Sequence, residues 1–87
     1  MATLNQPLTS DWVDISTAQS LTNGLYNLYC AGGQAELADV ASTATGVPAG
    51  LFGRRMVDGH SVAYKQVTGT SLWVKGVGVG TLVIDDA

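Results

Sequence analysis

The sequence predicts an all-β domain, built as a small antiparallel β-sandwich or flattened barrel of about six or seven short strands. The strongest indication is residues 60–85, where β-branched, aromatic and aliphatic residues occur in three short bursts separated by glycines. Shorter apolar runs between turn signals precede them. A chain of 87 residues is long enough for one domain. We therefore expect a single β domain over residues 12–87, preceded by an N-terminal arm over residues 1–11.

The first half of the chain divides into short elements. Residues 1–11 are mostly polar and show no period, so we expect them to form the arm. Residues 12–15, with the sequence Trp-Val-Asp-Ile, predict a short strand. Asn23-Gly24 is a turn signal, because asparagine and glycine readily adopt the positive φ of tight turns. Alternation in residues 25–31 predicts the next strand, with both faces partly apolar.

Residues 34–44 fit two interpretations. Apolar residues at positions 37, 40, 41 and 44 have the spacing of one helix face. A strand is favoured by the preceding Gly32-Gly33 pair, which would join it to residues 25–31 as a hairpin. No capping residue stands where a helix would begin. We expect a strand here, with a short helix as the alternative.

A long loop is predicted over residues 42–55, because a proline and three glycines disfavour regular structure there. Loops of this length are uncommon in compact domains and are often functional. This one carries Leu51 and Phe52 between glycines, followed by Arg54 and Arg55. Two interpretations stay open for the apolar pair: it caps the domain's own core, or it inserts as a tip into a neighbouring chain.

Three further strands are expected after the turn signal Asp58-Gly59. Their apolar bursts cover residues 62–67, 72–74 and 82–84. The glycines at positions 76, 78 and 80 precede a strand rather than a helix, so they indicate a hairpin or bulge and not a nucleotide-binding loop.

The composition points to association with other chains. A domain of this size buries only about 60–65% of the surface that its unfolded chain exposes, so its stability needs support. Cys30 is the only cysteine and His60 the only histidine, which excludes an internal disulfide and disfavours a metal site. Charged residues make up 13% of the chain, about half the usual share of roughly 25%. Contacts with partner subunits are the remaining way to stabilise the domain.

Several function classes are disfavoured. The net charge is −3, and Arg54-Arg55 is the only adjacent basic pair, which is too little for nucleic-acid binding. No apolar segment approaches the roughly 18–20 residues of a membrane span, and the N-terminus lacks the features of a signal peptide. A lone cysteine without such a signal fits synthesis in a reducing cytoplasm.

No catalytic, cofactor-binding or metal-binding residues are expected. The segment Asp58-Gly-His60-Ser61 contains the residue types of a catalytic triad, but neighbours on a strand point to opposite faces. Cys30 lies in an apolar strand, as an inert buried thiol would. The two tryptophans and three tyrosines fit core or interface positions, with a sugar-stacking platform as the alternative.

The order of motifs resembles the small β-sandwich virion structural proteins of tailed bacteriophages. The resemblance runs from Trp12-Val-Asp-Ile through Asn23-Gly-Leu-Tyr-Asn-Leu and Leu72-Trp-Val to Gly80-Thr-Leu-Val-Ile. It implies a virion protein of the capsid decoration or cement type, made in the host cytoplasm. Such proteins form homo-oligomers, commonly trimers, that bind a major capsid protein or another virion protein. Tail or head-tail accessory proteins, and a carbohydrate- or receptor-binding module, are the alternatives.

A protein interface is the one kind of site that we predict. Its apolar members would be buried against neighbouring subunits, and its arginines would fix the register of the contact through hydrogen bonds to carboxylates. These residues are Leu51, Phe52, Arg54, Arg55, Leu4 and Leu8. Neither nucleic acid nor a membrane is expected among the partners.

Overall fold

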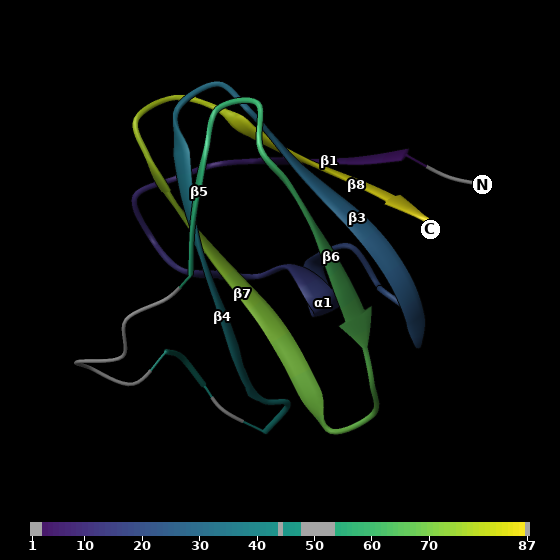
Figure 1. Ribbon diagram of the computed structural model, residues 1–87. Coiled ribbons are helices and arrows are strands. Elements are labelled where there is room, and N and C mark those ends of the chain that lie inside the picture. The colour runs from purple at the N-terminus through teal and green to yellow at the C-terminus, as the bar shows by residue number, and fades with distance from the viewer. Residues whose placement is uncertain (1–2, 44, 48–53, 87) are drawn as a thin grey trace.

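The computed structural model describes residues 3–43, 45–47 and 54–86, and it confirms the all-β prediction. Two four-stranded antiparallel sheets pack together as a sandwich (Figure 1). We call them sheet A and sheet B. Sheet A contains, in spatial order, β1 (Thr3–Pro7), β8 (Thr81–Asp86), β3 (Gly24–Ala31) and β6 (Ser61–Gln66). Sheet B contains β2 (Val13–Asp14), β7 (Thr70–Val77), β4 (Gln34–Ala41) and β5 (Arg54–Val57).

Most connections carry the chain from one sheet to the other. Of the consecutive described strands, β4 and β5 are the pair that hydrogen-bond to each other. The predicted hairpin at Gly32-Gly33 is therefore wrong, because these glycines lead from β3 in sheet A to β4 in sheet B. The expected hairpin or bulge at residues 76–80 likewise links β7 to β8 across the sandwich. Turn residues show where the chain reverses, but they do not show which strand becomes the hydrogen-bonded partner.

The N-terminal arm prediction is also wrong. Residues Thr3–Pro7 form β1, which pairs with β8 from Thr3 opposite Asp85 to Pro7 opposite Thr81. Leu4 lies on the inner face and is partly buried, while the Leu8 side chain is only 8% exposed. The Leu8 amide donates to the Gly80 carbonyl oxygen at 2.9 Å. Between the two leucines, Asn5 and Pro7 are exposed, while the inner-face position carries the polar, half-buried Gln6, so the strand alternation was hidden in the sequence.

The segment Trp12–Ile15 is a strand only over Val13–Asp14. Helix α1 (Ile15–Ala18) follows directly, with the Asp14 side chain as its cap. The Asp14 carboxylate accepts from the Thr17 amide at 3.2 Å and from the Thr17 hydroxyl at 2.9 Å. This capping satisfies a backbone N–H that the first turn of a helix leaves free. The helix buries Ile15 in the core.

The strand interpretation of residues 34–44 is confirmed over Gln34–Ala41, and the helix alternative is wrong. The loop after it is shorter than predicted, because Arg54 and Arg55 already belong to strand β5. Leu51 and Phe52 lie outside the described residues.

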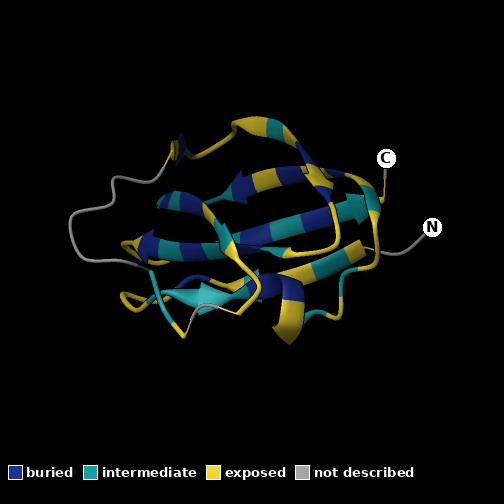
Figure 2. Cartoon of the chain, turned by 90° about the horizontal axis from the view of Figure 1, so that it is seen from below, coloured by how far each residue is buried: buried dark blue, intermediate teal, exposed yellow. Residues whose placement is uncertain are grey.

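The core lies between the two sheets. Figure 2 shows buried residues alternating with exposed ones along the strands, as expected when each sheet turns one face inward. The fully buried large side chains come from both sheets and from α1: Ile15, Leu28, Leu37, Met56, Leu72, Val74, Leu82 and Ile84. At about 1.5–3 kcal/mol for each large side chain, this burial is the main stabilising contribution.

A buried tyrosine fixes the chain where it enters β3. The Tyr26 hydroxyl donates to the Thr22 carbonyl oxygen at 2.8 Å and accepts from the Thr22 amide at 3.1 Å. A tyrosine hydroxyl bonded to backbone a few residues upstream is the tyrosine corner of immunoglobulin-like sandwiches.

Substituting Tyr26→Phe removes this hydroxyl and leaves the Thr22 backbone groups without it. We expect the free energy of unfolding in urea to fall by about 1–2 kcal/mol. Tyr29→Phe is the matched control, because the described residues form no side-chain hydrogen bond with the exposed Tyr29. Equal effects of the two substitutions would show that the corner contributes nothing to stability.

Candidate protein interface

The outer face of sheet A is mostly uncharged. The strand register places Asn5, Val83, Tyr29 and Ser61 in one row across its four strands. Leu25 lies two rows away on β3, beyond the row of Asn27. Its side chain is 56% exposed, and that of Tyr29 is 41% exposed.

Two charged residues belong to the described part of this outer face. Asp85 accepts a hydrogen bond from the Thr3 hydroxyl at 2.6 Å, and Lys65 lies opposite Leu25. Asn27 and Ala63 complete the row of Thr3 and Asp85. A flat face with exposed aromatic and aliphatic side chains and few charges has the composition of a protein contact surface.

The outer face of sheet B carries charged side chains that contact one another. Trp12, Lys75, Glu36 and Arg55 form a chain of contacts across it. The Lys75 ammonium lies 5.3 Å from the centroid of the Trp12 ring and 3.4 Å from the Glu36 carboxylate. Arg55 lies 3.7 Å from the same carboxylate. The Glu36 carboxylate thus lies between two cations of the same chain, and Val77 on the same face is 45% exposed.

The four described residues of the predicted interface, Leu4, Leu8, Arg54 and Arg55, do not gather at one place. Leu8 is a core residue and Leu4 packs against the core, so the prediction that these two are buried against neighbouring subunits is wrong. They fill the chain's own sandwich because β1 is part of sheet A. Arg54 and Arg55 are exposed on β5, where each pairs with a carboxylate of β4: Asp39 at 3.8 Å and Glu36 at 3.7 Å.

Sequence reasoning missed this candidate contact face on sheet A. Its signal was present in residues 25–31, where Leu25 and Tyr29 alternate with the buried Tyr26, Leu28 and Cys30. A strand that is apolar on both faces lies in a sheet covered on both sides, or exposes one apolar face. In this structure it exposes one.

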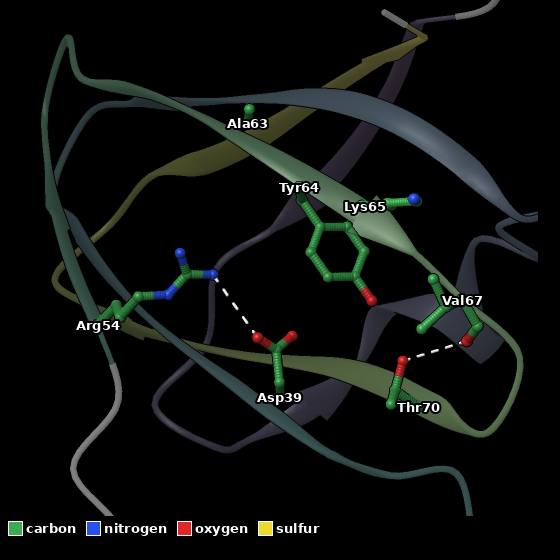
Figure 3. A pocket seen from close by; sticks show the side chains of 7 residues that line it. All are labelled: Asp39, Arg54, Ala63, Tyr64, Lys65, Val67 and Thr70. Atoms are coloured by element: carbon green, nitrogen blue, oxygen red, sulfur yellow. Dashed lines mark hydrogen bonds and ion pairs between the residues drawn. The ribbon is translucent and has the colours of Figure 1, made fainter.

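A hollow of about 320 Å³ opens between the sheets at the β6 edge of the sandwich. Figure 3 shows the Tyr64 ring pointing into it, with Asp39 and Arg54 on one side and Val67 and Thr70 on the other. The Arg54–Asp39 ion pair is more than half exposed.

Beside the hollow lies a buried hydrogen-bond network centred on Gln66. Its side-chain oxygen accepts from the Ser16 hydroxyl at 2.6 Å and from the Tyr64 hydroxyl at 2.7 Å. Its side-chain nitrogen donates to the carbonyl oxygens of Thr70 at 2.7 Å and Val67 at 3.1 Å. Burial raises the pKa of the Tyr64 hydroxyl, which stays protonated and able to donate. All four hydrogen-bonding positions of the Gln66 amide are satisfied, so the network is structural.

The residue types of a triad are not assembled for catalysis. Asp58 accepts from the Gly32 amide at 2.8 Å and thus holds a turn. His60 and Ser61 are exposed. Cys30 is buried, and burial together with the negative charge of Asp58 raises the pKa of its thiol. The described residues contain no group of three or more His, Cys, Asp or Glu side chains that could hold a metal ion.

The aromatic side chains do not form one platform either. Tyr26 and Tyr64 are buried in the core, and Trp12 and Trp73 belong to the sheet B side. Tyr29 is exposed on sheet A. The two tryptophans and three tyrosines therefore do not gather into one stacking platform, although Trp12 and Trp73 lie on the same side of the sandwich.

No protein-family model, curated protein or solved structure matches this chain. The family expected from the motif order therefore stays a prediction. In the part of the chain that the structure describes, no helix is long and apolar enough to cross a membrane.

Proposed function

We propose that this chain is a non-enzymatic structural protein of a phage virion, of the capsid decoration or cement type. The observation that carries the proposal is the outer face of sheet A, which presents Leu25, Tyr29 and Val83 together with two described charged residues, Lys65 and Asp85. Large exposed side chains on a rigid sheet lose little conformational freedom when they are covered, which suits a surface that works by contact alone.

Low charge content supports the same role. With 13% charged residues, the chain has few groups to keep its surface dispersed in water. A decoration protein is held at many equivalent positions on a lattice, so modest contacts by each subunit add up through multivalency. Placement on the head is proposed here over placement on the tail, which the same surface chemistry also fits.

The test is to change the apolar face without disturbing the core. The double substitution Leu25→Glu and Tyr29→Glu puts two carboxylates on the surface that the proposal buries. We expect virions of the phage that encodes the chain to carry at least tenfold less of this variant, because buried anchors each contribute about 2 kcal/mol or more to binding. Occupancy is measured by quantitative electrophoresis of purified virions, and the position by labelled electron microscopy.

The matched control adds the same charge elsewhere. Ala18→Glu with Ser42→Glu changes two exposed residues that lie outside sheet A. This control should load normally, and both variants should melt within a few degrees of the parent chain. Equal loading of the Leu25/Tyr29 variant, or absence of the chain from purified virions, would contradict the proposal.

A further inference from the structure

The sandwich has four edge strands, and three of them are short or protected. Strand β2 has two residues and β5 has four. Strand β1 contains Pro7, and its Asn5 carbonyl oxygen accepts from the Gln19 side chain at 3.4 Å. Proline and covering side chains are the usual protection of a sheet edge. Strand β6 is the longest edge, with six residues and no proline.

The register of β6 shows which backbone groups it leaves open. The Cys30 amide donates to the His60 carbonyl oxygen at 3.0 Å, and β6 pairs antiparallel with β3 from that point on. Hydrogen-bonded positions alternate in an antiparallel pair, so the even positions 62, 64 and 66 bond to β3. The N–H and C=O groups of Ser61, Ala63 and Lys65 point the other way. Among the described residues, no other strand of sheet A lies on that side.

The hollow borders this same edge. Ala63 and Lys65 line it although their side chains belong to the outer face of sheet A, so it lies along the outer edge of the strand (Figure 3). Tyr64 lines it from the inner face. Strand addition is the binding mode in which an extended segment pairs with an open sheet edge. Backbone hydrogen bonds to the edge give affinity, and the side chains of the added segment give specificity by entering neighbouring pockets such as this hollow.

We propose that β6 pairs with β6 of a second copy of this chain, antiparallel about a twofold axis at Ala63. The two sheets A then form one continuous eight-stranded sheet. Such a contact is isologous, with the same surface on both copies, as in most homodimers. The inference goes beyond the proposed virion role, because it states how two copies join whatever else they bind.

The side chains of β6 favour this register. Ala63 lies opposite the partner's Ala63, where small side chains leave the axis unobstructed. Lys65 lies opposite the partner's Ser61, so the two ammonium groups stay apart. All three open residues then bond across the new strand pair. If the partner strand is shifted by two residues, only two of the three open residues form backbone hydrogen bonds. If it is shifted by four residues, Lys65 lies opposite the partner's Lys65, where like charges repel.

The inner face fits as well. In this register Val62 lies opposite the partner's Tyr64. By symmetry, Tyr64 lies opposite the partner's Val62 on the other side of the twofold axis. Val62 is partly buried against the core of its own copy, and Tyr64 points into the hollow. An aliphatic side chain beside an aromatic one on facing strands is a favourable cross-strand pair. The second copy thus covers the mouth of the hollow with apolar surface.

The register is tested by opposite charges at one position. Ser61 faces Tyr29 within its own chain, so a charge there meets no ionic partner inside the monomer. Ser61→Glu places a carboxylate opposite each Lys65 of the dimer and should tighten the dimer about fivefold at low salt. Ser61→Lys should weaken it by a similar factor. Both effects should shrink as salt is added. Analytical ultracentrifugation measures the dimer dissociation constant.

A second pair of variants tests the backbone bonds. Ala63→Pro removes an N–H that does not bond to β3, so the fold should persist while the dimer is lost. Ala63→Ser keeps the N–H and should dimerise as the parent chain does. The proposal is overturned if the parent chain is monomeric at millimolar concentration. It is also overturned if Ala63→Pro dimerises unchanged, or if the two Ser61 variants shift the constant in the same direction. Virion occupancy tests the contact made by the outer face of sheet A, whereas the dissociation constant tests pairing through β6. The virion proposal and the dimer proposal can therefore fail separately.

Discussion

Substitution of Gln66 by methionine should lower the free energy of unfolding by about 3 kcal/mol or more. The Gln66 side chain is 6% exposed and makes four hydrogen bonds, to Ser16, Tyr64, Val67 and Thr70. Methionine has similar length and leaves all four of these groups without their partner. Each buried polar group left unsatisfied costs about 1–3 kcal/mol, and relaxation of the surroundings recovers part of the sum.

The effect should spread beyond the immediate contacts. The Ser16 hydroxyl that donates to Gln66 also accepts from the Leu72 amide at 2.9 Å, which ties α1 to β7. Without Gln66, the β6–β7 turn and α1 lose their shared anchor. Urea denaturation checks the prediction, with Gln34→Met as control, because the described residues give that half-buried glutamine no side-chain hydrogen bond. A loss under 1 kcal/mol for Gln66→Met would show that the network is dispensable.

The substitution Gly80→Ala should be as damaging, for a steric reason. A Cβ atom at Gly80 would overlap the Gly32 carbonyl oxygen and lie 2.8 Å from its carbonyl carbon. Both are backbone atoms of the turn between β3 and β4, so neither can rotate out of the way. Relief requires the two turns to separate, which also strains the bond from the Leu8 amide to the Gly80 carbonyl. We expect a loss of about 3 kcal/mol, a large share of the stability of a small domain.

The control for this prediction is Gly46→Ala. No atom of the described residues lies within 4 Å of the position where its Cβ would be built, and its φ is not in the left-handed region. That substitution should leave stability unchanged or raise it by a few tenths of a kcal/mol, because alanine restricts the unfolded chain. Thermal melts of both variants, followed by circular dichroism, separate the outcomes. A Gly80→Ala protein that melts with the parent chain would contradict the close approach of the two turns.

The strands that could be predicted from the sequence are those with a local signal. Residues 25–31 alternate over their whole length, and residues 70–77 and 81–86 are rich in β-branched and aromatic residues, so each reads as a strand by itself. Strand β1 was missed because Pro7 and polar outward residues mask two inward leucines. Helix α1 was missed because four residues are too few to show a helical period.

Pairing of the strands could not be predicted, because it depends on contacts between distant residues. The glycine turns at residues 32–33 and 78–80 look like hairpin turns in sequence, yet both lead into the opposite sheet. The Gln66 network was invisible for the same reason. A glutamine at the end of a strand is usually exposed, and its partner Ser16 lies fifty residues away in the chain. The exposed face of sheet A follows from alternation once the buried face is known.

The central place of β8 in sheet A affects how the chain can assemble during its synthesis. Residues 81–86 lie between β1 and β3, beside the first strand of the chain (Figure 1). Until the ribosome has released these residues, β1 has no strand to pair with, and β3 has β6 on one side only. Such non-local pairing makes folding slow and leaves sheet edges open to other nascent chains. Sheet A can therefore be completed only after β8 has left the ribosome, long after β1 has been synthesised.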